Sequence, residues 1–179
     1  MPRMKDLYRK TVAPELAKEL GFTNVHQIPK ITKVVVNAGV GRAALDAKKL
    51  ESVIKGLRDI TGQAPVITKA KKSIAGFKLR EGMSVGATTT LRGDMMYEFL
   101  DRLVSVALPR VRDFRGLKKE AFDGHGNYSL GIREHGVFPE IPFEEASEPF
   151  GLQVNISTTA VDDASAKALL KHLGFPFKG

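Results

Sequence analysis

The stretch that decides the fold is MSVGATTTLR, residues 83–92. Val85, Ala87, Thr89 and Leu91 alternate along it with a second set of small or polar residues: Ser84, Gly86, Thr88, Thr90 and Arg92. Successive side chains of a β-strand point to opposite faces. The segment therefore predicts a strand with one face toward a core and one polar face, as is typical of antiparallel sheets with an open side.

Patterns on either side of this strand predict the other elements. Apolar residues recur at helical spacing in 5–20, 46–60, 94–108 and 163–173, and strands are expected at 31–40, 64–68, 127–133 and 152–156. Asp46 and Asp94 are predicted N-caps, and Pro109 is predicted to end the third helix. The fold class expected is α+β, with a mostly antiparallel sheet and helices packed on one face. We expect a single domain over 1–179, with an extended loop between the strands at 64–68 and 83–92.

Charge is the most informative feature of the composition. The chain has 28 Lys and Arg against 20 Asp and Glu, a formal net charge of +8. Residues 1–120 hold 24 of the basic and 12 of the acidic residues, whereas residues 121–179 hold 4 and 8. A basic front of this kind favours a polyanionic partner such as nucleic acid. A basic protein that binds no nucleic acid is the other interpretation.

Signals of catalysis are weak. The four histidines, at positions 26, 125, 135 and 172, lack metal-ligand spacing, and the chain has no cysteine. Asp162 and Asp163 adjoin each other where a helix begins, so helix capping is expected of them. Asn37–Arg42 (NAGVGR) is either a tight exit from a strand or a phosphate-binding turn, although the third glycine of a GxGxxG motif is absent. We therefore expect no enzyme, no cofactor and no metal.

RNA binding has better support in a basic loop. Residues 63–80 contain Lys69, Lys71, Lys72, Lys78 and Arg80 and no acidic residue. Small residues such as Ser73 are interleaved with them, together with one aromatic residue, Phe77. We expect a flexible, positive loop whose backbone can approach phosphates. An ordinary solvated loop is the alternative, but such a loop has no need to exclude acidic residues.

Two further groups of residues suggest contact with RNA. A second basic cluster, which includes Arg110, Arg112 and Arg115, follows the third helix, where cations also favour a helix C-terminus. The polar strand face suits 2′-hydroxyl groups in the shallow minor groove of helical RNA. A plain solvent-exposed face is the alternative for these residues.

Long motifs in the chain resemble a known family. LRDITGQAPVITKAKKS (57–73), KITKVVVNAGVG (30–41), RVRDFRGL (110–117) and the ending GFPF (174–177) are similar to bacterial large-subunit ribosomal protein number five. The resemblance covers essentially the whole chain. It implies a structural constituent of the large ribosomal subunit that binds 5S and 23S ribosomal RNA in the central protuberance.

The resemblance also implies site residues and partners. The 5S surface would comprise Arg3, Lys33, Asn37, Gln63, Thr90 and Arg92. The loop facing P-site transfer RNA would comprise Lys69, Lys71, Lys72, Ser73, Phe77, Lys78 and Arg80. A bridge to small-subunit head ribosomal protein number thirteen is placed at Arg110, Arg112, Arg115 and the 137–149 loop. We expect a cytoplasmic location in the ribosome, with neither membrane association nor a homo-oligomer.

Two other classes of function stay open on the sequence. One is a nucleotide-dependent enzyme that uses residues 39–42. The other is a general RNA-binding or chaperone module outside the ribosome.

Overall fold

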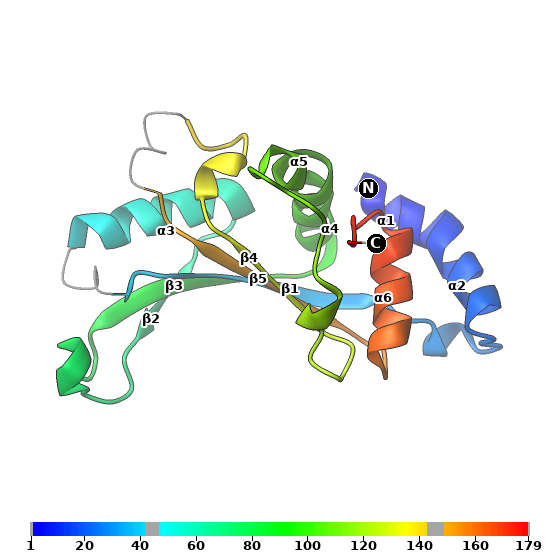
Figure 1. The fold of residues 1–179 in the computed structure, drawn as a ribbon, viewed down its shortest axis with the longest axis horizontal. Coiled ribbons are helices and arrows are strands. Elements are labelled where there is room, and N and C mark those ends of the chain that lie inside the picture. Colours follow the sequence, from blue (N-terminus) through cyan, green and yellow to red (C-terminus); the bar gives the residue numbers. More distant parts are fainter. Residues whose placement is uncertain (1, 42–46, 143–148, 179) are drawn as a thin grey trace. The chain divides into compact units, whose positions relative to one another are not determined.

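The computed structural model describes residues 2–41, 47–142 and 149–178. Its five strands are β1 (Ile31–Gly39), β2 (Val66–Lys69), β3 (Ser84–Leu91), β4 (Tyr128–Ile132) and β5 (Leu152–Thr158). They form one antiparallel sheet in the order β2-β3-β1-β5-β4. The α+β class with helices packed against an antiparallel sheet is confirmed (Figure 1).

The chain divides into two compact units. We call residues 35–91 and 131–154 the hairpin unit, and residues 1–34, 92–130 and 155–179 the helical unit. Strands β1, β4 and β5 contribute residues to both. The expectation of one RNA-binding domain over the whole chain stays a prediction.

The hairpin unit is built from α3 (Ala47–Thr61) and the β2–β3 hairpin. Helix α3 lies along β3 (Figure 1), and its apolar stripe buries Val53, Leu57 and Ile60. Gly62, with φ +69°, ends the helix as predicted, and its N–H donates to the carbonyl of Arg58 at 2.7 Å. Asp46, the predicted N-cap, lies outside the described residues.

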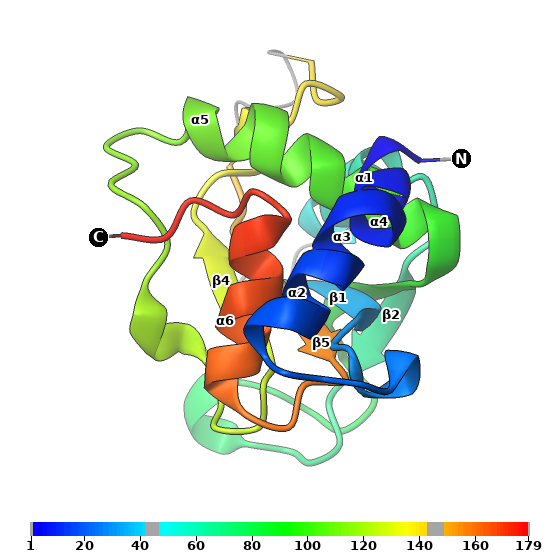
Figure 2. The same cartoon turned by 90° about the vertical axis from the view of Figure 1, so that its right-hand side faces the viewer.

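The helical unit begins with an unbroken helical segment. It consists of α1 (Arg3–Leu7), a π-helical turn η1 (Tyr8–Val12) and α2 (Ala13–Glu19). The prediction of a helix over 5–20 is therefore confirmed. Figure 2 shows this segment beside α4 (Gly93–Arg102) and α6 (Asp163–His172). Met4, Leu16, Phe99, Leu103 and Leu169 are buried in this unit.

Two predictions about α4 are wrong. Arg92, not Asp94, is the N-cap, and Asp94 lies in the first turn, where it pairs with Lys5. Pro109 does not end the helix, because a π-helical turn η5 (Leu103–Ala107) leads into α5 (Leu108–Arg110), where proline occupies the first turn. The Leu108 N–H donates to the Leu103 carbonyl, so the helix continues through the π-helical turn, and this wider turn accommodates the proline ring. Helix α6, by contrast, begins as predicted, and the Asp162 carboxylate accepts from the Ser165 N–H at 3.2 Å.

Short 3-10 turns complete the chain. They are η2 (Val25–Gln27), η4 (Ala75–Phe77), η6 (Lys119–Ala121) and η7 (His135–Val137). No helix in the described ranges is both long and apolar enough to cross a membrane.

Candidate nucleic-acid interface

Strand β3 has the two faces that its sequence predicts. Ala87, Thr89 and Leu91 are buried, whereas Thr88 is half-buried and Thr90 is exposed. We call the second side, with Asn37, Gly39, Gly86, Thr88 and Thr90, the open strand face. The buried side meets α3, so the unit has an apolar interior and a polar exterior on the same strand. The alternation predicted from residues 83–92 is confirmed.

The backbone of the open strand face is very closely spaced at Gly86. A Cβ atom built there would lie 2.4 Å from the Ala38 carbonyl oxygen and 3.2 Å from Thr68 Oγ1. Glycine is therefore required where β3 meets β1. Gly39 lies beside it, since its Cα is 3.2 Å from the same built Cβ, yet a Cβ on Gly39 itself would have nothing within 4 Å. Gly86 is thus buried against β1, whereas Gly39 is exposed with open space beside it.

The open strand face also carries polar groups. Gln63 Nε2 donates to the Thr90 carbonyl at 3.2 Å, so the structure brings these two predicted site residues together. The Thr88 hydroxyl donates to the Val36 carbonyl at 3.3 Å. Asn37 is half-buried on β1. Amide and hydroxyl groups of this kind can donate hydrogen bonds to, and accept them from, a ligand that lies flat on the strands.

The predicted site residues of the helical unit have different surroundings. Lys33 is half-buried on β1, and Arg92 is exposed at the N-cap of α4. Arg3 forms a bidentate ion pair with Asp101, with Nε to Oδ2 at 3.0 Å and the second contact at 2.5 Å. The hydrogen bond and charge of Asp101 raise the pKa of Arg3 above its ordinary value. An RNA phosphate would share this guanidinium with a carboxylate.

The basic loop is an ordered hairpin. We call residues 70–82 the hairpin tip. Ile74 and Leu79 exchange main-chain hydrogen bonds of 3.0 and 3.1 Å, with η4 between them. Ala70 N donates to the Met83 carbonyl at 2.8 Å, and Gly82 N donates to the Ala70 carbonyl at 2.9 Å. The irregular loop expected from the sequence is therefore held by its own main chain.

The charged residues of the loop all face solvent. Lys69, Lys71, Lys72, Lys78 and Arg80 are exposed, as is Ser73. The Ser73 hydroxyl oxygen accepts from the Glu81 N–H at 2.9 Å. Phe77 is 67% exposed, and Ile74 is 46% exposed. The tip thus presents cations and apolar side chains together, which an ordinary solvated loop does not require.

Arg110, the last residue of α5, is exposed in the helical unit, as are Arg112 and Arg115 on the segment that follows. The C-terminal segment holds the next residues in place: Leu117 N donates to the Pro176 carbonyl at 2.7 Å, and Lys178 N donates to the Leu117 carbonyl at 3.0 Å. Tyr128 Oη donates to the Lys118 carbonyl at 2.9 Å, and burial raises the pKa of Tyr128 to about 12. The sequence motifs at 110–117 and 174–177 are therefore joined by main-chain hydrogen bonding.

The interpretation of residues 39–42 as a phosphate cradle has little support. Val40 N donates to the Val85 carbonyl at 3.0 Å, so this amide belongs to the strand pairing and does not point to a ligand. Arg42 lies outside the described residues. A phosphate cradle needs several free backbone N–H groups.

Sequence reasoning missed three features of the structure. Thr89 follows the alternation into the interior, where its hydroxyl has no hydrogen-bond partner among the described residues. Asp163 accepts from the N–H groups of Gly124 (3.1 Å) and Gly126 (2.9 Å) and so fixes a distant turn. Arg80 N donates to Met83 Sδ at 3.1 Å. The alternation at 83–92 predicts the inward position of Thr89, so only its unpaired hydroxyl was missed, and no sequence signal indicates the other two features.

In the described ranges no group of three His, Asp or Glu side chains is arranged to hold a metal ion. His172 lies between Glu15 and Glu19 of α2, with nitrogen–oxygen distances of 3.1 and 2.7 Å. Its two ring nitrogens face different carboxylates, as in a link between α6 and α2. His135 is buried and its ring stacks on Phe150 at 3.9 Å between centroids. The contacts of these two histidines are therefore those of residues that stabilise the fold.

Comparison with known proteins assigns the chain a family. A model described as "Ribosomal protein L5" matches residues 24–80, and a second model, which describes the C-terminus of the same ribosomal protein family, matches residues 84–177. A protein of Geobacter sp. (strain M21) named "Large ribosomal subunit protein uL5" is 56% identical over 178 residues, covering 99% of both chains. Proteins of the same name from Synechocystis sp. and Microcystis aeruginosa are 55% and 54% identical, covering 98% of each chain.

Proposed function

Because the chain belongs to the ribosomal protein L5 family and is a structural constituent of the large ribosomal subunit, not an enzyme, we propose that it binds 5S ribosomal RNA through the open strand face. The observation that carries this proposal is the open strand face, where Gly39 and Thr90 are exposed, Asn37 is half-buried and Gln63 Nε2 donates to the Thr90 carbonyl. Members of this family work within the ribosome, which is cytoplasmic in bacteria.

The open strand face suits the minor groove of an RNA helix. That groove is wide and shallow, and it displays 2′-hydroxyl groups that both donate and accept hydrogen bonds. Gly39, which is exposed and has open space where a Cβ would lie, lets the sugar–phosphate backbone come close to the strands. In the proposed complex, Asn37, Gln63 and Thr90 bind the sugars and base edges. Arg3, Lys33 and Arg92 of the helical unit add contacts of their own, and Arg3 does so beside Asp101.

Three further partners complete the proposal. The basic residues from Lys69 to Arg80, with Ser73 and Phe77, face P-site transfer RNA. Arg110, Arg112 and Arg115, with the 137–149 loop, contact small-subunit head ribosomal protein number thirteen; residues 143–148 of that loop lie outside the described residues. Contacts with 23S ribosomal RNA in the central protuberance add to 5S binding. The exposure of these basic residues supports each contact, since phosphates are neutralised by accessible cations.

Neighbouring threonines allow a sharp test of the 5S surface. We expect Thr90→Val and Asn37→Ala each to weaken 5S binding by about five- to 100-fold, because a polar partner in the complex is left unpaired. Affinity is measured by filter binding with labelled 5S RNA. Thr89→Val is the matched control, since Thr89 faces the interior and is 1% exposed. Thr89→Val should bind like the parent; parental affinity in Thr90→Val and Asn37→Ala would contradict the proposal.

A general RNA chaperone is the second candidate, and the many exposed cations are consistent with it. Competition separates the two. A specific 5S complex should persist in a large excess of duplex RNA that lacks the 5S shape, whereas a chaperone complex would be displaced in proportion to the competitor. Displacement at equal nucleotide concentrations would favour the chaperone.

A further inference from the structure

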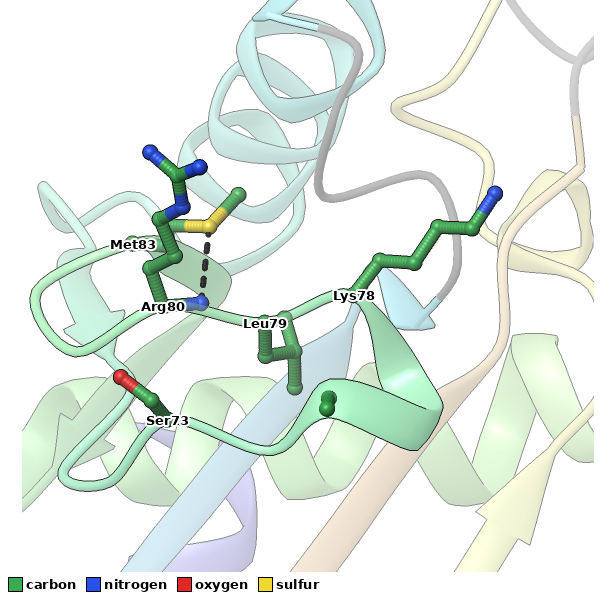
Figure 3. A pocket seen from close by; sticks show the side chains of 6 residues that line it. Ser73, Lys78, Leu79, Arg80 and Met83 are labelled. Carbon is green, nitrogen blue, oxygen red and sulfur yellow. Dashed lines mark hydrogen bonds between the residues drawn. The ribbon is translucent and has the colours of Figure 1, made fainter.

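An open hollow lies at the hairpin tip and the adjoining Met83 (Figure 3). Ser73, Ala75, Lys78, Leu79, Arg80 and Met83 line a space of about 820 Å³. Sites for small ligands usually measure about 300–1,000 Å³. The hollow is therefore large enough for one nucleotide of an RNA chain. All six residues belong to the hairpin unit.

The floor of the hollow is apolar and held in place by the main chain. Leu79 is fixed by its paired hydrogen bonds with Ile74, of 3.0 and 3.1 Å. Met83 is fixed through its sulfur, which accepts from the Arg80 N–H at 3.1 Å (dashed line in Figure 3). Ala75 begins the 3-10 turn η4. A surface built in this way before the ligand arrives loses little conformational entropy on binding.

The rim of the hollow is positively charged. Lys78 and Arg80 are both exposed, and their side chains leave the backbone on either side of Leu79 (Figure 3). Lys78 has φ +54°, in the left-handed region that residues with a Cβ seldom adopt. Ser73 uses its oxygen to accept from Glu81 N at 2.9 Å, which leaves its hydroxyl hydrogen for another acceptor. An apolar floor beneath cations matches a base attached to a phosphate.

We infer that this hollow receives a single unstacked nucleotide of transfer RNA, with its base on Leu79 and Met83 and its phosphates beside Lys78 and Arg80. The inference rests on the proposed orientation of the loop toward transfer RNA and adds how one nucleotide is held. A site for phosphate alone would need no apolar floor. A site for an apolar ligand would need no cations at its rim.

The test removes the base without touching the protein. The full chain is titrated with two short single-stranded RNAs that differ at one position, which carries either 2-aminopurine or an abasic ribose. Binding of the abasic RNA should be about tenfold weaker, in line with the usual contribution of one stacked base. The 2-aminopurine fluorescence should also change on binding. Equal affinity for the two RNAs would overturn the inference.

Two variants test the roles of the apolar floor and the charged rim separately. Leu79→Ala with Met83→Ala should make the two RNAs bind equally. Lys78→Asn should weaken both RNAs alike and lower the salt dependence of binding, because asparagine accepts the left-handed backbone but carries no charge. Circular dichroism verifies that each variant is folded. If Lys78→Asn abolished the preference for the base, or the floor variant kept it, the assigned roles would be wrong.

A 5S titration in the same preparation distinguishes this inference from the proposed function. Protein saturated with 5S RNA should still bind the 2-aminopurine RNA, and excess transfer RNA should displace it. Displacement by 5S RNA would show that the hollow belongs to the 5S surface and would overturn the assignment to transfer RNA. Loss of 5S binding itself would instead contradict the proposed function.

Discussion

At the residue scale, Gly86 is the described glycine at which an added Cβ would make the shortest contact. Its built Cβ would lie 2.4 Å from a backbone oxygen, whereas that of Gly39 would meet nothing within 4 Å. A clash with backbone cannot be relieved by turning a side chain. Replacement by alanine should therefore destabilise the fold at Gly86 and leave its stability nearly unchanged at Gly39.

We predict that Gly86→Ala lowers the free energy of unfolding by about 1–3 kcal/mol or more, the usual cost of overpacking. Gly39→Ala, the control, should stay within about 0.5 kcal/mol of the parent. Urea denaturation followed by circular dichroism measures both. Equal stability of the two variants would show that the strands can move apart at Gly86.

A second prediction at this scale concerns acid. The side-chain amide of Asn127, aided by the backbone N–H groups of Asn127 and His125, lowers the pKa of Asp123 from 3.8 to about 2. A carboxyl with a depressed folded pKa stabilises the fold above its unfolded pKa and loses that contribution as pH falls through its folded pKa. The window for Asp123 is therefore about pH 4 to pH 2.

We predict that Asp123→Asn, which keeps the acceptor oxygen but does not titrate, is less stable than the parent at pH 6. The difference should shrink as pH falls from 4 toward 2. Thermal unfolding of both proteins across this range measures it. A difference that stays constant down to pH 2.5 would mean that Asp123 does not contribute in this way.

At the element scale, the sequence predicted the type and rough position of every helix longer than one turn and of every strand. The alternation at 83–92 and the apolar stripes at 5–20 and 46–60 were sufficient to identify one strand and two helices, because each of these elements buries one side. Element ends were less predictable. Asp94 has the right residue type for an N-cap, but the strand runs to Leu91 and leaves Arg92 in that position.

Proline was the second source of error. Pro14 and Pro109 both lie within helical segments, and in each case a π-helical turn ends two residues before the proline. A wider turn removes the clash between the proline ring and the carbonyl of the preceding turn. A rule that proline ends a helix cannot foresee this, since the wider turn depends on packing around it.

Part of the candidate site was also predictable. Its charge and its polar strand face follow from composition and alternation. The bond between Gln63 and Thr90 (3.2 Å) and the hollow in the hairpin tip depend on how distant residues meet, which one sequence does not specify. Asn37, Gln63 and Thr90 lie in one compact unit, and Arg3, Lys33 and Arg92 in the other.

The hairpin as an element yields a prediction about division of labour. Lys71→Glu with Lys72→Glu should leave 5S affinity within about twofold of the parent and weaken transfer RNA binding at least about tenfold, because reversed charges repel phosphate. Filter binding with each RNA measures this. Lys167→Glu with Lys171→Glu on α6 changes the charge equally and is the control. A large loss of 5S affinity in the hairpin variant alone would contradict the prediction.

At the scale of the whole molecule, we expect the uneven distribution of charge to govern the proposed binding of RNA. Residues 1–120 hold 24 basic and 12 acidic residues, against 4 and 8 in the remainder. Cations that neutralise phosphates release counterions, so the logarithm of affinity should fall linearly with the logarithm of salt concentration. The slope reports the number of phosphates contacted, and it is independent of any single hydrogen bond.

We predict a steep negative slope for 5S binding between 50 and 400 mM KCl, of magnitude about 4 or more if several phosphates are contacted. Thr90→Val should lower affinity without changing this slope, because its hydroxyl carries no charge. Thermal unfolding in the same buffers controls for salt effects on the fold. Equal 5S affinity at low and molar salt would be incompatible with binding through phosphates.

The close approach at Gly86 also limits how this gene can change. Any single-base replacement in the first or second position of a glycine codon yields a stop or a residue that carries a Cβ, and no such residue fits against the Ala38 oxygen. The only single-base changes of codon 86 that leave the fold unaffected are therefore the synonymous ones. Codon 39 faces no such barrier from the described residues, so a restriction at that codon would point to the proposed RNA partner.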